Sequence, residues 1–128
     1  MIWAYLLFAL ACVLLALLWF GEALFRFALD RKKIAPQNAP QADEGWLVAE
    51  AQDCFLVSAD RLRLHAFLVE APGNDWAICL HGYTGRAQEM AGQARRFREM
   101  GFHVLAPDAR AHGRSEGRYV GMGWPDRL

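Results

Sequence analysis

Two short segments of the chain hold the residue types that catalysis most often uses. The first is the stretch 81–85 (His-Gly-Tyr-Thr-Gly), which directly follows an apolar run. The second follows a later apolar run and carries, in order, Asp108, Arg110, His112 and Ser115. A helical pattern separates the two runs, which predicts two parallel strands joined by a crossover helix. Both segments would then lie at the same edge of the sheet, where open α/β sheets carry their chemistry.

Ser115 lies in a stretch, 113–117, that matches the letters Gly-x-Ser-x-Gly of a nucleophile elbow. An elbow needs a buried strand directly before the serine and a helix directly after it. The residues 109–112 are not strand-like, and the residues 118–125 contain two glycines and a proline. Ser115 is therefore interpreted as a decoy. The other serine, Ser58, lies in a predicted hairpin.

The pattern around these segments predicts the elements that position them. An apolar stretch at 53–58 and an alternating stretch at 61–69 predict two antiparallel strands with a tight turn at 59–60. The continuous apolar run 76–80 predicts a strand covered on both faces. The alternation at 61–69 places one set of residues on one face of its strand and a second set on the other. These sets are Leu62, Leu64, Ala66 and Leu68, and Arg61, Arg63, His65 and Phe67.

The stretch 86–100 has the spacing of an amphipathic helix. Met90, Ala94 and Phe97 recur at i, i+4 and i+7 with charged residues between them. Gly101 follows as the residue that ends the helix. A second apolar strand is expected at 102–106.

The first residues of the chain do not resemble a soluble core. Residues 2–20 contain no charged side chain, and as a helix they would span roughly 28 Å, close to the thickness of bilayer hydrocarbon. The sequence favours an uncleaved membrane anchor over 1–29, with a cleaved signal peptide and a buried core helix as alternatives. Because the basic residues follow the apolar run, the positive-inside rule puts the domain after it on the cytoplasmic side.

Three parts are therefore expected: an anchor at 1–29, a linker at 30–45 and a folded domain at 46–128. The chain has 14 basic and 14 acidic side chains, so nothing in its charge favours nucleic acid as a partner. Its three cysteines form no disulfide framework or metal motif. A metal site built from His81, Asp108 and His112 is not indicated by any ligand spacing. No cofactor or metal is expected.

The order of these motifs resembles the N-terminal part of bacterial α/β-hydrolases. The likeness is to a membrane-anchored branch related to serine esterases, lipases and serine aminopeptidases. It covers about 46–128 and rests on the hairpin 58–65, the loops 81–85 and 108–117, and the tail 121–128. The resemblance implies an α/β fold in which an antiparallel hairpin precedes a strand-helix-strand unit of a parallel sheet. One transmembrane helix would precede this fold.

By this resemblance, the loop 81–85 supplies half of an oxyanion hole. The backbone N–H of Tyr83 would be the donor, supported by His81, Gly82 and Gly85. Gly82 is expected to let the backbone turn and come close to a substrate. The alternative is that the glycines only make a strand-to-helix turn, with Tyr83 as a packed aromatic ring. In this family the catalytic histidine comes near the C-terminus, so His81 is expected to shape the loop.

The resemblance further implies that Asp108, Arg110 and His112 belong to a structural network of ion pairs and hydrogen bonds. It implies hydrolysis of a carboxylic ester, thioester or amide by a Ser-His-Asp mechanism. With both serines set aside, the nucleophile, acid and histidine are expected beyond Leu128, and the chain is expected to be an inactive fragment.

The expected partners are a small-molecule or lipid-like acyl substrate and the lipid bilayer, through residues 2–20. One alternative is a non-enzymatic membrane protein on the same scaffold. Another is a complete small membrane protein that pairs with a partner chain through its exposed sheet.

Overall fold

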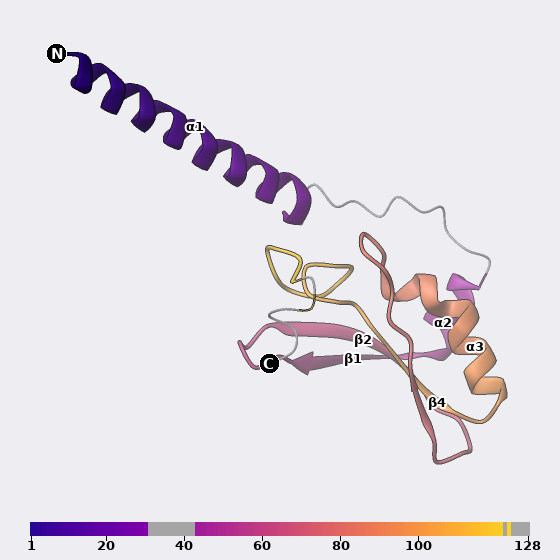
Figure 1. Cartoon of the computed structure of the whole chain (residues 1–128). Coiled ribbons are helices and arrows are strands. Elements are labelled where there is room, and N and C mark those ends of the chain that lie inside the picture. The colour runs from indigo at the N-terminus through magenta and orange to yellow at the C-terminus, as the bar shows by residue number, and fades with distance from the viewer. Residues whose placement is uncertain (31–42, 122, 124–128) are drawn as a thin grey trace.

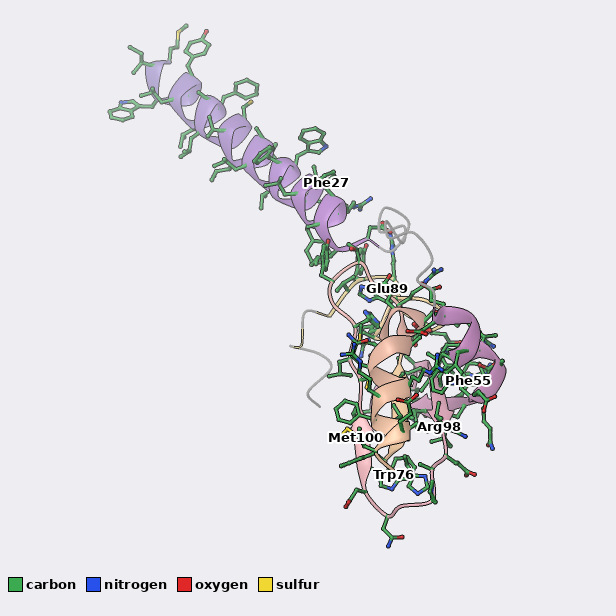
Figure 2. All side chains as sticks on the ribbon, turned by 90° about the vertical axis from the view of Figure 1, so that its right-hand side faces the viewer. Phe27, Phe55, Trp76, Glu89, Arg98 and Met100 are labelled. Carbon is green, nitrogen blue, oxygen red and sulfur yellow. The ribbon has the colours of Figure 1, made fainter. Side chains whose placement is uncertain are left out.

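In the computed structural model, the described residues are 1–30, 43–121 and 123. The first helix, α1 (Ile2–Leu29), projects away from the remaining elements, and only its last turn lies near them (Figure 1). Its side chains are exposed on every side (Figure 2). The helix is long and apolar enough to cross a membrane, a property it shares with signal sequences. Most of the predicted linker and the end of the predicted tail lie outside the described residues.

Four strands form one mixed sheet in the order β1-β2-β4-β3. They are β1 (Gln52–Val57), β2 (Arg63–Val69), β3 (Trp76–Ile78) and β4 (His103–Pro107). β2 pairs antiparallel with β1 and with β4, while β3 and β4 run parallel. The predicted fold class is confirmed, because an antiparallel hairpin is followed by a parallel strand-helix-strand unit.

Helices cover one face of this sheet. α2 (Glu44–Glu50) and α3 (Ala91–Glu99), with a short 3-10 turn at Ala87–Met90 before α3, pack beside β2 and β4 (Figure 1). The sequence did not predict α2, whose seven residues are too few for a clear helical period. The core between the helices and the sheet consists of Leu47, Phe67, Val69, Cys79, Ala87, Ala91, Ala94, Val104 and Ala106.

The buried face of β2 differs from the face that its leucines suggested. His65, Phe67 and Val69 are buried, while on the other face Leu64 and Leu68 are only half-buried and the small Ala66 between them is buried. The reason is that α2 and α3 lie over the first set, whereas the leucines point to the other face of the sheet. That face has no covering helix among the described residues.

The same asymmetry corrects the prediction for β3. Trp76 and Ile78 are 59% and 64% exposed, and Leu80, just after the strand, is 70% exposed. Cys79 faces the helices and is buried. The strand is therefore covered on one face only within the described part of the chain.

The crossover helix packs through small side chains. Ala91 and Ala94 are fully buried, whereas Phe97, predicted on the apolar stripe, is 37% exposed. Alanine on the inner face lets the backbone of α3 approach the sheet closely. Phe97 instead packs edge-on against the Phe102 ring, 5.8 Å between centroids, beyond the end of the helix.

The end of α3 is a Schellman motif. The Phe102 N–H donates to the Phe97 carbonyl at 3.0 Å, and the Gly101 N–H donates to the Arg98 carbonyl at 2.9 Å. Gly101 has φ +92°, in the left-handed region that favours glycine. The predicted helix end at Gly101 is thereby confirmed.

We expect Gly101→Ala to destabilise the protein by about 1–2 kcal/mol, because a Cβ at this φ clashes with the following carbonyl. Gly92→Ala is the matched control inside the same helix, where an added Cβ meets its nearest neighbour at an ordinary 3.5 Å. That change should stabilise by about 0.5–1 kcal/mol through helix propensity. Urea unfolding in detergent, followed by tryptophan fluorescence, measures both; equal effects of the two changes would contradict this account of the helix end.

Candidate functional site

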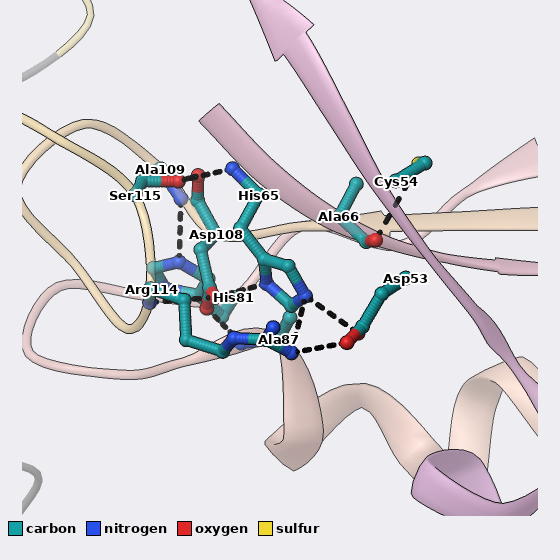
Figure 3. A network of polar contacts seen from close by, with 10 residues as sticks. All are labelled: Asp53, Cys54, His65, Ala66, His81, Ala87, Asp108, Ala109, Arg114 and Ser115. Atoms are coloured by element: carbon teal, nitrogen blue, oxygen red, sulfur yellow. Dashed lines mark hydrogen bonds and ion pairs between the residues drawn. The ribbon is translucent and has the colours of Figure 1, made fainter. Parts of the chain in front are cut away.

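The loops after β3 and β4 are joined through the ring of His81. The Ala109 N–H donates to His81 Nε2 at 3.0 Å. Because Nε2 accepts, the ring proton lies on Nδ1, which donates to the Gly82 carbonyl at 2.8 Å. The Gly85 N–H reaches the same carbonyl at 3.0 Å and closes the turn. His81 thus fixes the shape of its own loop and attaches it to the neighbouring one (Figure 3).

Asp108, the first residue after β4, has a fully buried carboxylate that binds three partners (Figure 3). Its Oδ2 accepts from His65 Nδ1 at 2.7 Å and from the Arg114 N–H at 3.0 Å. Its Oδ1 accepts from the Ala87 N–H at 2.7 Å, at the start of the turn that leads into α3. One carboxylate therefore joins β2, the loop after β4 and the helix that follows the loop 81–85.

The ring of His65 continues this network to β1. His65 Nε2 lies 2.9 Å from Asp53 Oδ1, and Arg114 Nη1 lies 2.7 Å from Asp53 Oδ2. Hydrogen bonds from His65 and Arg114 hold the pKa of Asp53 below its usual range. Partial burial raises the pKa of Asp53 but is outweighed by these two hydrogen bonds. The network therefore runs from the surface of β1 into the buried carboxylate of Asp108.

Ser115 is fully buried in the same network. Its hydroxyl donates to the Asp108 carbonyl at 2.6 Å and accepts from the His65 N–H at 2.9 Å. It lies in a loop, with neither a strand directly before it nor a helix directly after it. This geometry lacks the exposed, strained turn that an attacking serine needs.

Arg110 and His112 bind other residues than those that Asp108 binds. The Arg110 guanidinium forms a two-bond ion pair with Asp60, at 2.6 and 2.9 Å, in the turn of the β1–β2 hairpin. This pair lowers the pKa of Asp60 to about 2. His112 Nδ1 lies 2.9 Å from the Arg110 carbonyl, and its ring packs against that of His81, 4.9 Å between centroids. Asp108, Arg110 and His112 were expected to share one network of ion pairs and hydrogen bonds. In the contacts described above, each of the three side chains binds different residues.

Tyr83 lines a pocket of about 160 Å³ between the two loops, opposite His112 and Gly121. Its ring is about half exposed, and its hydroxyl donates to the Ala28 carbonyl at the end of α1. Within the described residues, no acceptor takes the backbone N–H of Tyr83. Tyr83 is therefore a pocket-lining residue whose backbone N–H has no acceptor within the described part of the chain.

The two glycines of this loop differ in the space that is available for a side chain. A Cβ at Gly82 would meet no atom within 4 Å, so open space lies beside that backbone. At Gly85 a Cβ would lie 2.9 Å from Glu89 Oε2 and 3.1 Å from the Gly82 carbonyl oxygen. The residue with φ in the left-handed region is Thr84, at 64°. The turn therefore depends on Thr84 and Gly85, and not on Gly82 as the sequence suggested.

The sequence marked His65 and Asp60 only as members of the hairpin motif 58–65, and it did not mark Asp53. His65 offers a signal in retrospect, because it is a titratable side chain among apolar neighbours in an alternating strand. Asp53 and Asp60 carry no such signal, since their roles depend on partners about 10 to 60 positions away along the chain. No group of three or more His, Cys, Asp or Glu within the described ranges could hold a metal ion.

Comparison with solved structures identifies the fold. The esterase Pf2001 of Pyrococcus furiosus is 28% identical, and the match covers 73% of this chain and 37% of the esterase, with a TM-score of 0.62. A second crystal form of the same esterase gives a TM-score of 0.63 at the same identity, with 73% of this chain and 38% of the esterase covered. An α/β-hydrolase of Vibrio vulnificus is 22% identical, with 74% of this chain and 35% of that protein covered and a TM-score of 0.56, which shows the fold alone.

The chain thus spans a little over a third of the length of these proteins. No protein-family model and no curated protein sequence matches it.

We expect Asp108→Ala to destabilise the protein by about 3–5 kcal/mol, because it leaves buried donors of His65 and Ala87 without their acceptor. Asp75→Ala, at an exposed position in the turn before β3, is the control and should change stability by about 0.5 kcal/mol or less. Urea unfolding measures both. A loss below about 1 kcal/mol for Asp108→Ala would show that the network does not hold the loops.

The pair of Asp60 and Arg110 makes stability depend on pH in acid. The folded-state pKa of Asp60 is about 2, below its ordinary 3.8. The stabilisation is therefore present above about pH 4 and is lost as the pH falls towards 2. We expect Asp60→Asn to reduce the slope of unfolding free energy against pH in this window and to leave the slope unchanged above pH 5. Urea unfolding at several pH values measures the slope, and identical slopes for both proteins would contradict the assignment.

Proposed function

We propose that this chain, which is related to the α/β-hydrolase superfamily, carries the oxyanion-stabilising loop of a membrane-anchored serine hydrolase. The observation that supports this most is the position of Tyr83. Its N–H has no acceptor among the described residues, and Tyr83 lines a pocket at the edge of the sheet where the parallel strands β3 and β4 end. This is the edge at which open α/β sheets bind their ligands.

The chemistry follows from charge. When a serine attacks the carbonyl of an ester, thioester or amide, negative charge develops on the carbonyl oxygen. A fixed backbone N–H stabilises that charge without reorganising, and one such donor is worth about 100- to 1,000-fold in rate. The hydrogen bonds of His81 to Gly82 and Ala109 hold the loop in place, so Tyr83 meets the requirement of a preorganised donor. The open space beside Gly82 leaves room for a substrate.

We place the attacking serine, its histidine and its acid outside residues 1–128. Ser115 is buried and bonded on both sides, and Ser58 is bonded to Asp60 within the hairpin turn. Burial raises the pKa of the Cys79 thiol, which disfavours a thiolate nucleophile there. His81 holds the loop together through both ring nitrogens. These side chains have structural tasks, so they are poor candidates for a Ser-His-Asp mechanism.

The apolar helix α1 supports the membrane part of the proposal. Residues 2–20 of this helix are exposed, no residue of the helix is buried, and its first acidic residue is at position 22. We propose that residues 2–20 cross the bilayer and that the domain lies on the cytoplasmic side, because the basic residues follow this apolar run. An anchor beside the site favours a small-molecule or lipid-like acyl substrate.

Labelling with a fluorophosphonate tests the serine mechanism. We expect the product of the complete gene, in membranes, to be labelled at one serine outside residues 1–128, and Ser115→Ala to keep the label. Mass spectrometry of the labelled peptide identifies the residue. A label on Ser115 would overturn the assignment of the nucleophile, and no label at all would favour a non-enzymatic protein on the same scaffold.

Two substitutions at Tyr83 test the donor. Tyr83→Phe keeps the backbone N–H and should retain ester hydrolysis within about tenfold of wild type, whereas Tyr83→Pro removes the N–H and should lower kcat about 100- to 1,000-fold. Fluorescence-detected unfolding of each variant checks that the fold is kept. Equal activity of the folded proline variant and the wild type would exclude Tyr83 as the oxyanion donor.

A further inference from the structure

The end of α1 is bonded to the loops of the candidate site. The Tyr83 hydroxyl donates to a backbone carbonyl in the last turn of α1, and the Val120 N–H donates to the Leu29 carbonyl at 3.0 Å. Asp30 extends this contact as an antiparallel bridge with Tyr119. In Figure 1 the last turn of α1 lies beside the yellow loop, while the rest of the helix points away. The final turn of the helix is thus part of the domain.

A second pocket, of about 460 Å³, lies between this turn and the loops. Its volume is within the range of ligand pockets, about 300–1,000 Å³. Phe25 and Leu29 form the wall on the side of α1, and Leu62, Tyr119 and Val120 face them from the domain. The rings of Phe25 and Tyr119 pack at 5.1 Å between centroids, which joins the two walls.

Charged side chains complete the lining. Asp60 and Arg110 neutralise each other through their ion pair. Arg118 adds a guanidinium that lies over the Tyr119 ring, 4.9 Å from its centroid. The pocket therefore has mostly apolar walls, which suit an acyl chain, with one guanidinium beside them.

The two pockets are neighbours. Arg110, Val120 and Gly121 line both the pocket of about 460 Å³ and the pocket of about 160 Å³ that Tyr83 lines. An acyl chain in the larger pocket can therefore present its carbonyl end to the smaller one.

The place of the larger pocket along α1 points to the bilayer as the source of that chain. Phe25 lies about 8 Å beyond Phe20 along the helix axis. If residues 2–20 fill the hydrocarbon, Phe25 lies in the headgroup layer, which is about 5–8 Å thick on each side. The pocket would open at the depth where the acyl chain of a lipid can leave the bilayer.

We propose that α1 is one wall of an acyl-chain binding site, and that this site receives the chain of a membrane lipid and directs its carbonyl end towards Tyr83. This inference rests on the proposed function in one respect, because it takes the bound chain to be the acyl part of the substrate. The anchor would then select the substrate as well as attach the protein. Leu62, Tyr119 and Val120 would set the accepted chain length.

Photolabelling tests the site without requiring hydrolysis. The complete gene product, in phosphatidylcholine vesicles, is irradiated with a palmitic acid analogue that carries a terminal diazirine. We expect label on the segments 60–63 and 117–121 in addition to α1, and we expect unmodified palmitate to compete for it. Label confined to α1 would show ordinary lipid contact and would overturn the proposal.

Two matched tryptophan substitutions sharpen this test. Leu62→Trp fills the pocket, and Val57→Trp places the same side chain on the same hairpin at a position that is 70% exposed and outside the pocket. We expect Leu62→Trp to reduce labelling of the segment 117–121 about tenfold. A tenfold loss of affinity corresponds to excluding about two methylene groups of the acyl chain from the pocket. Val57→Trp should leave the labelling unchanged. Equal labelling of both variants would contradict an acyl site at this place.

The two proposals fail separately. Fluorophosphonate labelling without competed photolabel in the pocket segments would keep the serine hydrolase and remove the acyl site. Competed photolabel without fluorophosphonate labelling would keep the lipid-binding site and remove the hydrolase.

Discussion

The buried carboxylate of Asp108 is the contact on which the geometry of the site depends. It stands where β4 ends, and it binds the ring of His65, the N–H of Ala87 and the N–H of Arg114 at 2.7–3.0 Å. A carboxylate in this position is costly to bury unless every oxygen is bonded. The requirement to satisfy it therefore draws β2, the loop after β4 and the start of α3 to one point. Each donor comes from a different part of the chain, so local preference alone would not have assembled them.

The loop that carries Tyr83 is held from two sides as a result. On the side of the domain, Ala109 binds the His81 ring and Ala87 binds Asp108, so both ends of the loop are fixed to the segment after β4. On the other side, the Tyr83 hydroxyl binds the last turn of α1. A backbone donor can act on developing charge only if it does not need to reorient. The bonds on both sides of Tyr83 would provide that rigidity in the proposed donor role.

The elements of the fold were readable from the sequence where the pattern is local. The hairpin follows from alternation, the crossover helix from a helical period, and the helix end from the glycine at position 101 that comes directly after that period. Which face of β2 would be buried was not readable, because it depends on α2 and α3. The partners of Arg110 and Asp108 were not readable either, since Asp60 and His65 lie 50 and 43 positions before them. The residue types in the sequence were enough to locate the two loops. The partner that each side chain binds became known only from the packing of the folded structure.

The uncovered face of the sheet has a practical consequence. Trp76, Ile78 and Leu80 lie on it with large exposed areas, next to half-buried leucines of β2 and β4. A continuous apolar patch of this kind promotes self-association in water. Detergent would mask this patch as readily as it masks α1. A need for detergent during purification of residues 1–128 would therefore not be diagnostic of the anchor, because removing α1 leaves this apolar patch exposed.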